Sequence, residues 1–275
     1  MNGKDMRIID VSAHQGKIKW DKAKENIDAV IIRAGYGKGN LDKHFQDNIQ
    51  GALDAGLPIG IYWFSYAYSV DMARKEAQYC NDFICPYKDS IILPVFFDWE
   101  YDSMNYAKKN GVKPDKQLIT DMNVAFCRRI DDLGYKAGYY LNLDYQRNYI
   151  DESRLNGYYK WLAYYTNDIK NNTFDIWQYS STGRIPGISG NVDLNKSDTD
   201  FVTETAEDNG MQIIQSGDKG KAVAIWQIIA GAYPDGEFGA ETIKATEIFQ
   251  EEHGLDIDGI VGPKTWAEGF KSVNG

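Results

Sequence analysis

The chain has 275 residues and a formal net charge of −10. This length exceeds one average domain and fits an α/β barrel with a small appendage, and the composition excludes disordered and collagen-like chains. No apolar run reaches the roughly 18 to 20 residues that cross a bilayer, and most of the excess negative charge follows residue 200. We therefore expect neither membrane insertion nor a nucleic-acid partner. Three cysteines and three scattered histidines predict no disulfide framework, metal site or other cofactor.

The first 196 residues alternate short apolar runs with amphipathic segments, which is typical of a mostly parallel sheet. The predicted strands are Arg7–Val11, Ala29–Arg33, Pro58–Phe64, Leu93–Trp99, Ala137–Leu141, Trp161–Tyr164, Phe174–Tyr179 and Asn191–Leu194. The predicted helices are Trp20–Glu25, His44–Ala55, Val70–Ile84 and Lys116–Leu133. Eight strands suit a closed barrel, and the segments after Ala137 are too short or broken for full helices. We expect an irregular TIM-like (β/α) barrel over residues 1–196 with a helix-poor second half.

Residues 197–213 are polar and acidic and predict a linker. Residues 214–275 predict a small all-α domain of three helices, at Lys221–Ala230, at Ala240–His253 and from Pro263 onward. Two similar stretches, Asp235 to Thr242 and Asp258 to Thr265, each form a tight turn before a helix and indicate an internal pseudo-repeat. The core predicted for this domain is Trp226, Phe238, Phe249, Val261 and Trp266.

Acidic residues lie where predicted strands end. Asp98 and Glu100 flank Trp99, and side chains two residues apart on a strand share a face. Asp10 ends the first strand and Asp193 lies in the eighth, and these strands are neighbours in a closed barrel. Glycoside hydrolysis needs one carboxyl group that keeps its proton and another that supplies negative charge near the oxocarbenium-like transition state. These four residues are the candidate catalytic group.

Aromatic and polar side chains recur near the same strand ends, where rings can stack on the C–H faces of sugars. The candidate substrate-binding residues are Arg33, Tyr62, Phe64, Tyr140, Trp161, Trp177 and Gln178. Core packing is the alternative for each aromatic. An ion pair with Asp98 or Glu100 across neighbouring strands is the alternative for Arg33, and plain strand-ending roles are the alternative for Asp10 and Asp193.

Five segments over residues 7–196 together resemble glycoside hydrolase family 25. They are Ile9-Asp10-Val11-Ser12 with Gln15-Gly16, Pro58 to Phe64, Asp98-Trp99-Glu100, Trp177-Gln178-Tyr179 and Gly190 to Asn195. These enzymes are the Chalaropsis-type lysozymes, N-acetylmuramidases found among phage endolysins and bacterial autolysins. The tail, from Ile214 to Phe270, resembles the peptidoglycan-binding domain of wall hydrolases. That likeness rests on Gly217 to Gly220, Phe249-Gln250 and Gly254 to Trp266.

The resemblance implies hydrolysis of the β-1,4 bond between N-acetylmuramic acid and N-acetylglucosamine in bacterial peptidoglycan. Glu100 would be the proton donor, and Asp98 would stabilise positive charge or orient the substrate's 2-acetamido group. Asp10 and Asp193 would orient and provide electrostatic support. The resemblance also implies retention of anomeric configuration, which the spacing of Asp98 and Glu100 does not by itself decide.

Two other functions stay open, a non-catalytic cell-wall-binding protein and a glycosidase of chitin-like polymers. The lack of a recognisable signal peptide favours a phage-type enzyme made in the host cytoplasm and released to the wall at lysis. A bacterial enzyme exported by another route is the alternative. The sequence does not indicate the oligomeric state.

Overall fold

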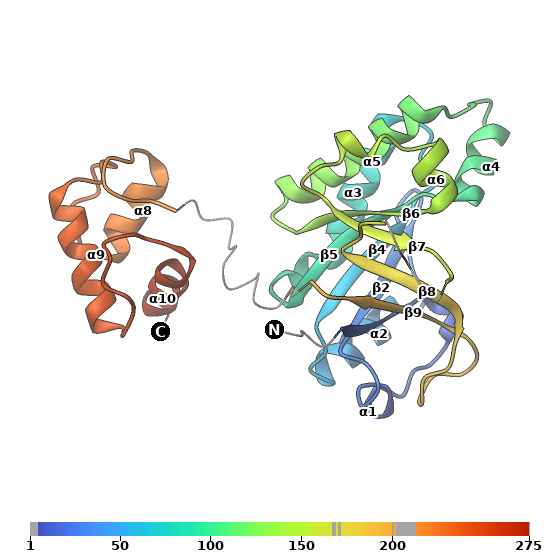
Figure 1. The fold of residues 1–275 in the computed structure, drawn as a ribbon, viewed down its shortest axis with the longest axis horizontal. Helices are drawn as coiled ribbons and strands as arrows, with labels where there is room; N and C mark the ends of the chain where they lie inside the picture. The colour runs from blue at the N-terminus through green and yellow to red at the C-terminus, as the bar shows by residue number, and fades with distance from the viewer. Residues whose placement is uncertain (1–4, 167–168, 170–171, 200, 202–212, 275) are drawn as a thin grey trace. The chain divides into compact units, whose positions relative to one another are not determined.

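The structure, a computed structural model, describes residues 5–166, 169, 172–199, 201 and 213–274. The chain divides into two compact units, residues 1–200 and residues 201–275 (Figure 1). Most of the predicted linker lies outside the described residues, although Ser197 at its start still belongs to the last strand of the first unit. None of the described helices is both long and apolar enough to cross a membrane.

Eight strands of the first unit form a closed barrel. Their order around it is β1 (Met6–Val11), β9 (Val192–Ser197), β8 (Ile176–Gly183), β7 (Tyr159–Ala163), β6 (Ala137–Asn142), β5 (Ile91–Asp98), β4 (Ile59–Phe64) and β2 (Ala29–Tyr36). Pairing of β1 with β2 closes the barrel, and the two-residue β3 (Asn40–Leu41) adds to β2 as a short hairpin. All eight predicted strands are therefore confirmed, and their ends differ by a few residues.

Strand β9 runs in the opposite direction to the other seven barrel strands. It is antiparallel to both β1 and β8, whereas all other neighbouring barrel strands are parallel. The start of β9 therefore lies at the end of the barrel where the parallel strands finish. This reversal places Asp193, the second residue of β9, directly opposite Asp10 near the end of β1.

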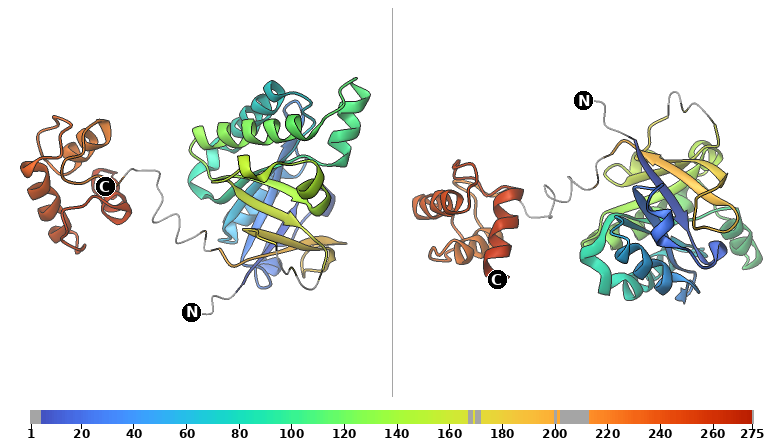
Figure 2. Two further views of the ribbon diagram at one scale, coloured as in Figure 1. Left: turned by 45° about the horizontal axis from the view of Figure 1, so that its top comes forward. Right: turned by 90° about the horizontal axis from the view of Figure 1, so that it is seen from below.

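Among the described residues, the helices of the first unit precede β7. They are α1 (Trp20–Ala23), α2 (Phe45–Asp54), α3 (Val70–Ile84), α4 (Tyr101–Lys109), α5 (Lys116–Asp132) and α6 (Leu143–Asn148), with 3₁₀ turns at Ala13–Gln15, Cys85–Ser90 and Glu152–Arg154. The four predicted helices are confirmed, and α4 and α6 were not predicted. No α-helix lies between β7 and β9 in the described part, so the second half is helix-poor as expected (Figure 2).

Alternation along β5 shows how the barrel is filled. Phe97 faces outward and its ring lies 4.7 Å from that of Phe126 on α5, whereas Phe96 faces inward and lies 5.2 Å from the ring of Trp161. Gly138 on the next strand makes room for the inward ring, because a Cβ there would lie 2.4 Å from Phe96. Large aromatic side chains thus form the floor beneath the mouth of the barrel.

The second unit contains α8 (Lys221–Ile229), α9 (Ala240–Glu252) and α10 (Pro263–Asn274). Its buried core includes all five predicted residues, together with Ile214 and Val223. Among the described residues, single β-bridges join Ile214 to Val261 and Lys219 to Glu237. The predicted three-helix arrangement is confirmed.

The two similar stretches of the predicted pseudo-repeat each form a turn, and one buried glutamine is hydrogen-bonded to each turn. Gln227 Nε2 donates to Asp235, to the carbonyl of Glu237 and to Thr242, and Gln227 Oε1 accepts from Gly236 N–H at 2.9 Å. Every polar group of the Gln227 side chain therefore has a partner.

Gln250 repeats this pattern 23 positions later in the chain. Its Nε2 donates to Asp258 at 2.8 Å and to the carbonyl of Ile260 at 2.9 Å, with a longer contact to Thr265 at 3.4 Å. Its Oε1 accepts from the backbone N–H groups of Asp258 and Gly259. The same side chain thus closes the same kind of turn in both halves of the unit.

Candidate active site

The strand register brings the predicted residues to one level of the barrel. Phe64 on β4 pairs with Asp98 on β5, which pairs with Tyr140 on β6, which in turn pairs with Trp161 on β7. Asp10 on β1 pairs with Asp193 on β9, and Gln178 on β8 pairs with Asn195 on β9. The candidate acidic residues therefore gather at one mouth of the barrel.

Asp98 and Glu100 form the first carboxyl pair and share a hydrogen bond. Asp98 ends β5 and is 5% exposed, whereas Glu100 is half-buried at the N-cap position of α4. Burial raises the pKa of Asp98 well above its usual range, and the charge of Glu100 raises it further. Burial also raises the pKa of Glu100, although the hydrogen bond with Asp98 opposes that rise. The pKa values of both carboxyl groups of this pair are therefore raised.

Asp10 and Asp193 form the second carboxyl pair, also joined by a hydrogen bond. Burial and the charge of Asp193 raise the pKa of Asp10 to about 8. Two amides act against that rise, because Gln178 Nε2 and Asn195 Nδ2 donate to Asp10 Oδ2 at 3.0 and 2.8 Å. Burial raises the pKa of Asp193 as well. The mouth thus contains two hydrogen-bonded carboxyl pairs.

Aromatic side chains hold these amides in place. The hydroxyl groups of Tyr140 and Tyr165 each donate to Gln178 Oε1 at 3.1 Å. Trp161 Nε1 donates to Asn195 Oδ1 at 2.8 Å. Because the amide oxygens accept these bonds, each amide nitrogen is directed at Asp10.

Tyr165 and Asn195 belong to the site but were not among the candidates. Asn195 lies two residues after Asp193 on β9, and the strand period could have placed it on the same face. Tyr165 follows β7 in a loop, where no periodic pattern marks its direction. Only the tertiary structure shows that it reaches Gln178.

Arg33 pairs with Asp42 rather than with the first carboxyl pair. Its Nη2 and Nε atoms lie 2.6 and 2.7 Å from Asp42 Oδ2. Strand β4 separates β2 from β5, so the alternative of an ion pair across neighbouring strands is not what the structure shows. Arg33 still acts on the site, because its charge favours the ionised form of Asp98 and opposes the rise of the Asp98 pKa.

The remaining aromatic candidates occupy different surroundings. Tyr62 is 8% exposed and lies edge-on to Trp161 inside the barrel, and Phe64 is half-buried against Tyr66. Trp177 points away from the carboxyl groups, because Gln178 beside it points toward them. Trp177 donates to the Tyr164 carbonyl and lies beneath the Lys196 ammonium group. Strand alternation therefore separates Trp177 from the acidic cluster.

The described residues include no group of three or more histidine, cysteine, aspartate or glutamate side chains suited to hold a metal ion. What the mouth does provide is a set of carboxyl groups with raised pKa values, one of which has an unused acceptor. Asp98 Oδ1 is buried and has no hydrogen-bond partner among the described residues. Such an arrangement can donate a proton and stabilise a neighbouring positive charge.

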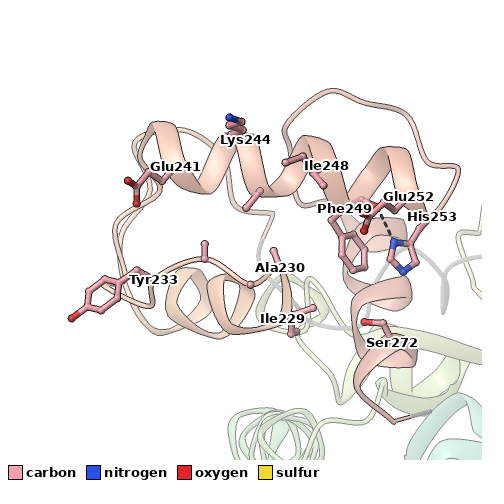
Figure 3. A pocket seen from close by; sticks show the side chains of 13 residues that line it. Ile229, Ala230, Tyr233, Glu241, Lys244, Ile248, Phe249, Glu252, His253 and Ser272 are labelled. Carbon is pink, nitrogen blue, oxygen red and sulfur yellow. Dashed lines mark hydrogen bonds between the residues drawn. The ribbon is translucent and has the colours of Figure 1, made fainter.

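The second unit has an open groove of about 630 Å³ between the end of α8 and the face of α9 (Figure 3). Tyr233 is 76% exposed at one end, and Ile248 is 46% exposed along α9. At the other end the His253 ring stacks on Phe249 at 3.9 Å and contacts the Phe249 carbonyl through Nδ1. Glu241 and Lys244 supply polar groups on the rim.

Two family models match the chain in different places. The model described as glycosyl hydrolases family 25 matches residues 9–188, and the model described as a putative peptidoglycan binding domain matches residues 229–268. Among curated relatives, the autolytic lysozyme of Clostridium acetobutylicum is 27% identical, over 98% of this chain and 74% of its own length. Lysozyme M1 of Streptomyces globisporus is also 27% identical, over 68% of this chain and 66% of its own length.

Among solved structures, the modular autolysin LytC from Streptococcus pneumoniae has a TM-score of 0.61 and 28% sequence identity. The match covers 70% of this chain but only 46% of LytC, so this chain spans about half of that autolysin. The family 25 model, by contrast, covers well over half of this chain and includes the barrel strands that carry Asp10, Asp98 and Gln178. The chain therefore belongs to glycosyl hydrolases family 25.

Proposed function

We propose that this protein is an N-acetylmuramidase that hydrolyses the β-1,4 bond between N-acetylmuramic acid and N-acetylglucosamine in bacterial peptidoglycan. The observation that carries the proposal is the pair of hydrogen-bonded carboxyl couples at the mouth of a family 25 barrel. The match of residues 229–268 to a peptidoglycan-binding model supports the same polymer independently.

In this proposal Glu100 protonates the glycosidic oxygen. Its pKa is raised by burial, so it keeps a proton closer to neutral pH than an exposed glutamate does. Glu100 is also less buried than Asp98, which leaves it accessible to a bound glycan. Protonation of the leaving oxygen lowers the barrier to breaking the bond.

Asp98 stabilises the positive charge at the sugar ring or orients the 2-acetamido group of the substrate. Its Oδ1 atom has no partner among the described residues and is free to accept a substrate N–H group. Burial raises the pKa of Asp98 well above its usual range, and the positive charge of Arg33 opposes that rise, which favours the ionised form that this role requires. Asp10 and Asp193 supply orientation and electrostatic support, and Gln178 Nε2 donates to Asp10.

We propose that cleavage retains the anomeric configuration, as the family resemblance implies. Inverting glycosidases separate their carboxyl groups by about 6.5 to 9.5 Å, so that a water molecule fits between them. The side chains of Asp98 and Glu100 interact directly, which does not suit that wide separation. Proton NMR of the first product formed from a soluble glycan tests this, and an initially inverted anomer would contradict it.

Among the other candidates, we assign substrate contact to Arg33, Tyr62, Phe64, Tyr140 and Gln178. Trp161 is 2% exposed, so we assign it a supporting role through Asn195 rather than stacking on sugar. We do not assign Trp177 a substrate contact.

Mass spectrometry of digested peptidoglycan tests the function, because the new reducing sugar identifies the bond that was cut. We expect N-acetylmuramic acid at the new reducing end and no product with Glu100→Gln, which keeps the shape but cannot donate as an acid. Asp71→Asn removes the same charge from the exposed start of α3 and should leave activity intact. Equal lysis by Glu100→Gln would exclude this assignment. Faster cleavage of chitin oligomers would favour the chitinolytic alternative.

We further propose that residues 214–275 anchor the enzyme to the wall and that residues 1–196 form the catalytic domain. A fragment of residues 1–200 should cleave soluble muropeptides but bind sedimented walls less tightly than the full chain. Equal wall binding would show that the tail is not the anchor. Synthesis in a phage-infected cytoplasm with release at lysis fits this arrangement and can be tested by localising the protein before and after membrane breach.

A further inference from the structure

The loop that follows β4 contacts each of the three residues Asp98, Trp99 and Glu100. We name residues Ser65 to Ala67 the brace segment. Ser65 N–H donates to the Asp98 carbonyl at 2.7 Å, and Trp99 Nε1 donates to the Ala67 carbonyl at 2.8 Å. Three consecutive residues of the candidate catalytic strand end therefore depend on the position of this short loop.

The contact with Glu100 passes through one serine. Glu100 N–H donates to Ser103 Oγ at 3.0 Å, and the same hydroxyl donates to the Ser65 carbonyl at 2.6 Å. Ser103 is fully buried, so water does not compete for these bonds. The backbone at Glu100 is thereby tied to the brace segment.

Glu76 on α3 is hydrogen-bonded to the brace segment. Its Oε1 accepts the backbone N–H of Tyr66 at 3.1 Å, and the Glu76 side chain also interacts with Ser65. Glu76 is 1% exposed, and its second oxygen, Oε2, is buried with no hydrogen-bond partner among the described residues. An acid buried in this way costs stability compared with an apolar residue, so its presence needs a reason other than packing.

We propose that Glu76 is a positioning residue for the Asp98–Glu100 pair, acting through the brace segment. The proposal rests on the catalytic role proposed above for that pair. Glu76 Oε1 serves as a fixed acceptor for the loop, and burial raises the pKa of its carboxyl group to about 8. Loss of this acceptor frees Tyr66 N–H and lets the Ser65 and Ala67 contacts shift together. Displacements of about 1 Å at a catalytic group lower rates by about 100-fold.

Two substitutions separate positioning from mere stability. Glu76→Gln keeps an acceptor oxygen of the same reach and should retain at least half of kcat on soluble muropeptides. Glu76→Leu removes the acceptor and should lower kcat by about tenfold or more with KM changed less than twofold. If the leucine variant does not fold, Glu76→Asp withdraws the carboxyl group by one methylene and should also lower kcat.

Glu152→Leu is the matched control. Glu152 is a half-buried acid that binds Lys160 and Tyr139, and none of its described contacts reaches the brace segment. Its loss should lower the melting temperature and leave kcat unchanged. A fall in kcat equal to that of Glu76→Leu would reduce Glu76 to a general stability role and overturn the proposal.

Hydrogen exchange at the Trp99 indole provides a readout that needs no activity. Trp99 is 2% exposed and its N–H group is bonded to Ala67, so exchange in the wild type should be slow. Glu76→Leu should speed this exchange at least tenfold relative to Glu152→Leu, and Glu76→Gln should not. Unchanged exchange together with unchanged kcat would overturn the proposal. If Glu76→Leu exchanges faster but the wild-type protein cleaves no glycan, the proposed function is refuted. The structural link from Glu76 through the brace segment to Trp99 would still stand.

Discussion

The barrel and the C-terminal unit both bury polar side chains, but they satisfy them differently. Gln227 and Gln250 are neutral amides whose oxygen and nitrogen atoms all have partners in the turns they close. The barrel mouth buries acids against other acids, which raises the pKa values of Asp10 and Asp98. Fully hydrogen-bonded amides stabilise one arrangement of the turn. Neighbouring buried carboxyl groups have raised pKa values, which allows one of them to donate a proton near neutral pH.

Asp98→Asn, in the acidic cluster of the barrel mouth, should have the largest effect of the variants, and it should act on kcat. The amide keeps the size of the side chain but cannot carry the negative charge that the transition state requires. We expect kcat to fall about 1,000-fold, or about 4 kcal/mol, with the folded structure retained. Steady-state kinetics on soluble muropeptides measures this, and a loss of less than tenfold would remove Asp98 from the mechanism.

Gln250→Leu tests how much the fully hydrogen-bonded glutamines stabilise the C-terminal unit. It leaves the N–H groups of Asp258 and Gly259 without their acceptor in a buried turn. We expect the C-terminal unit to lose about 3 kcal/mol of unfolding free energy while the barrel keeps its own transition. Calorimetry should resolve the unfolding transition of the C-terminal unit from that of the barrel. Gln215→Leu, at an exposed position, is the control and should change neither transition.

Asp10→Asn should stabilise the barrel at higher pH. The pKa of Asp10 is about 8 in the folded state against a usual value of 3.8, so its contribution to stability is present below about pH 4 and is lost as pH rises toward 8. Asparagine keeps an acceptor for Gln178 and Asn195 without this loss. We expect the variant to exceed the wild type by on the order of 2 kcal/mol at pH 8 and to match it near pH 4.

Asp121 provides the control of opposite sign. Hydrogen bonds from Gln117 and Arg154 lower its pKa, so its contribution is present at neutral pH and is lost as pH falls below its usual value. Asp121→Asn should therefore destabilise slightly at pH 8. Urea unfolding from pH 4 to pH 8 checks both variants. Parallel pH profiles for wild type and Asp10→Asn would contradict the assigned pKa.

Tyr233→Ala should have the smallest effect. Its ring is exposed in the groove of the second unit, where it is free to stack on a glycan. We expect wall binding of the full chain to weaken by about 1 kcal/mol, or roughly fivefold, with stability unchanged. Ile257→Ala removes an exposed apolar side chain outside this groove and should not alter sedimentation with walls.

Strand periodicity was sufficient for much of the barrel. It located the eight barrel strands and placed Asp98 and Asp10 at strand ends, because a buried strand is locally recognisable by its apolar run. It failed for Arg33, whose partner Asp42 lies nine residues away along the chain but across a hairpin. It also overlooked α4 (Tyr101–Lys109), which directly follows the candidate catalytic residue Glu100 at its N-cap position.

The sequence by itself determined the strands, the two units and the acidic residues, since each depends on local pattern and short spacing. Only the tertiary structure decided how those residues meet. The reversal of β9 set Asp193 against Asp10, the alternation of β8 turned Gln178 inward and Trp177 outward, and the loop after β4 tied itself to Trp99. Asn195 and Asp10, which such a contact joins, are 185 positions apart in the chain, and no local rule encodes it.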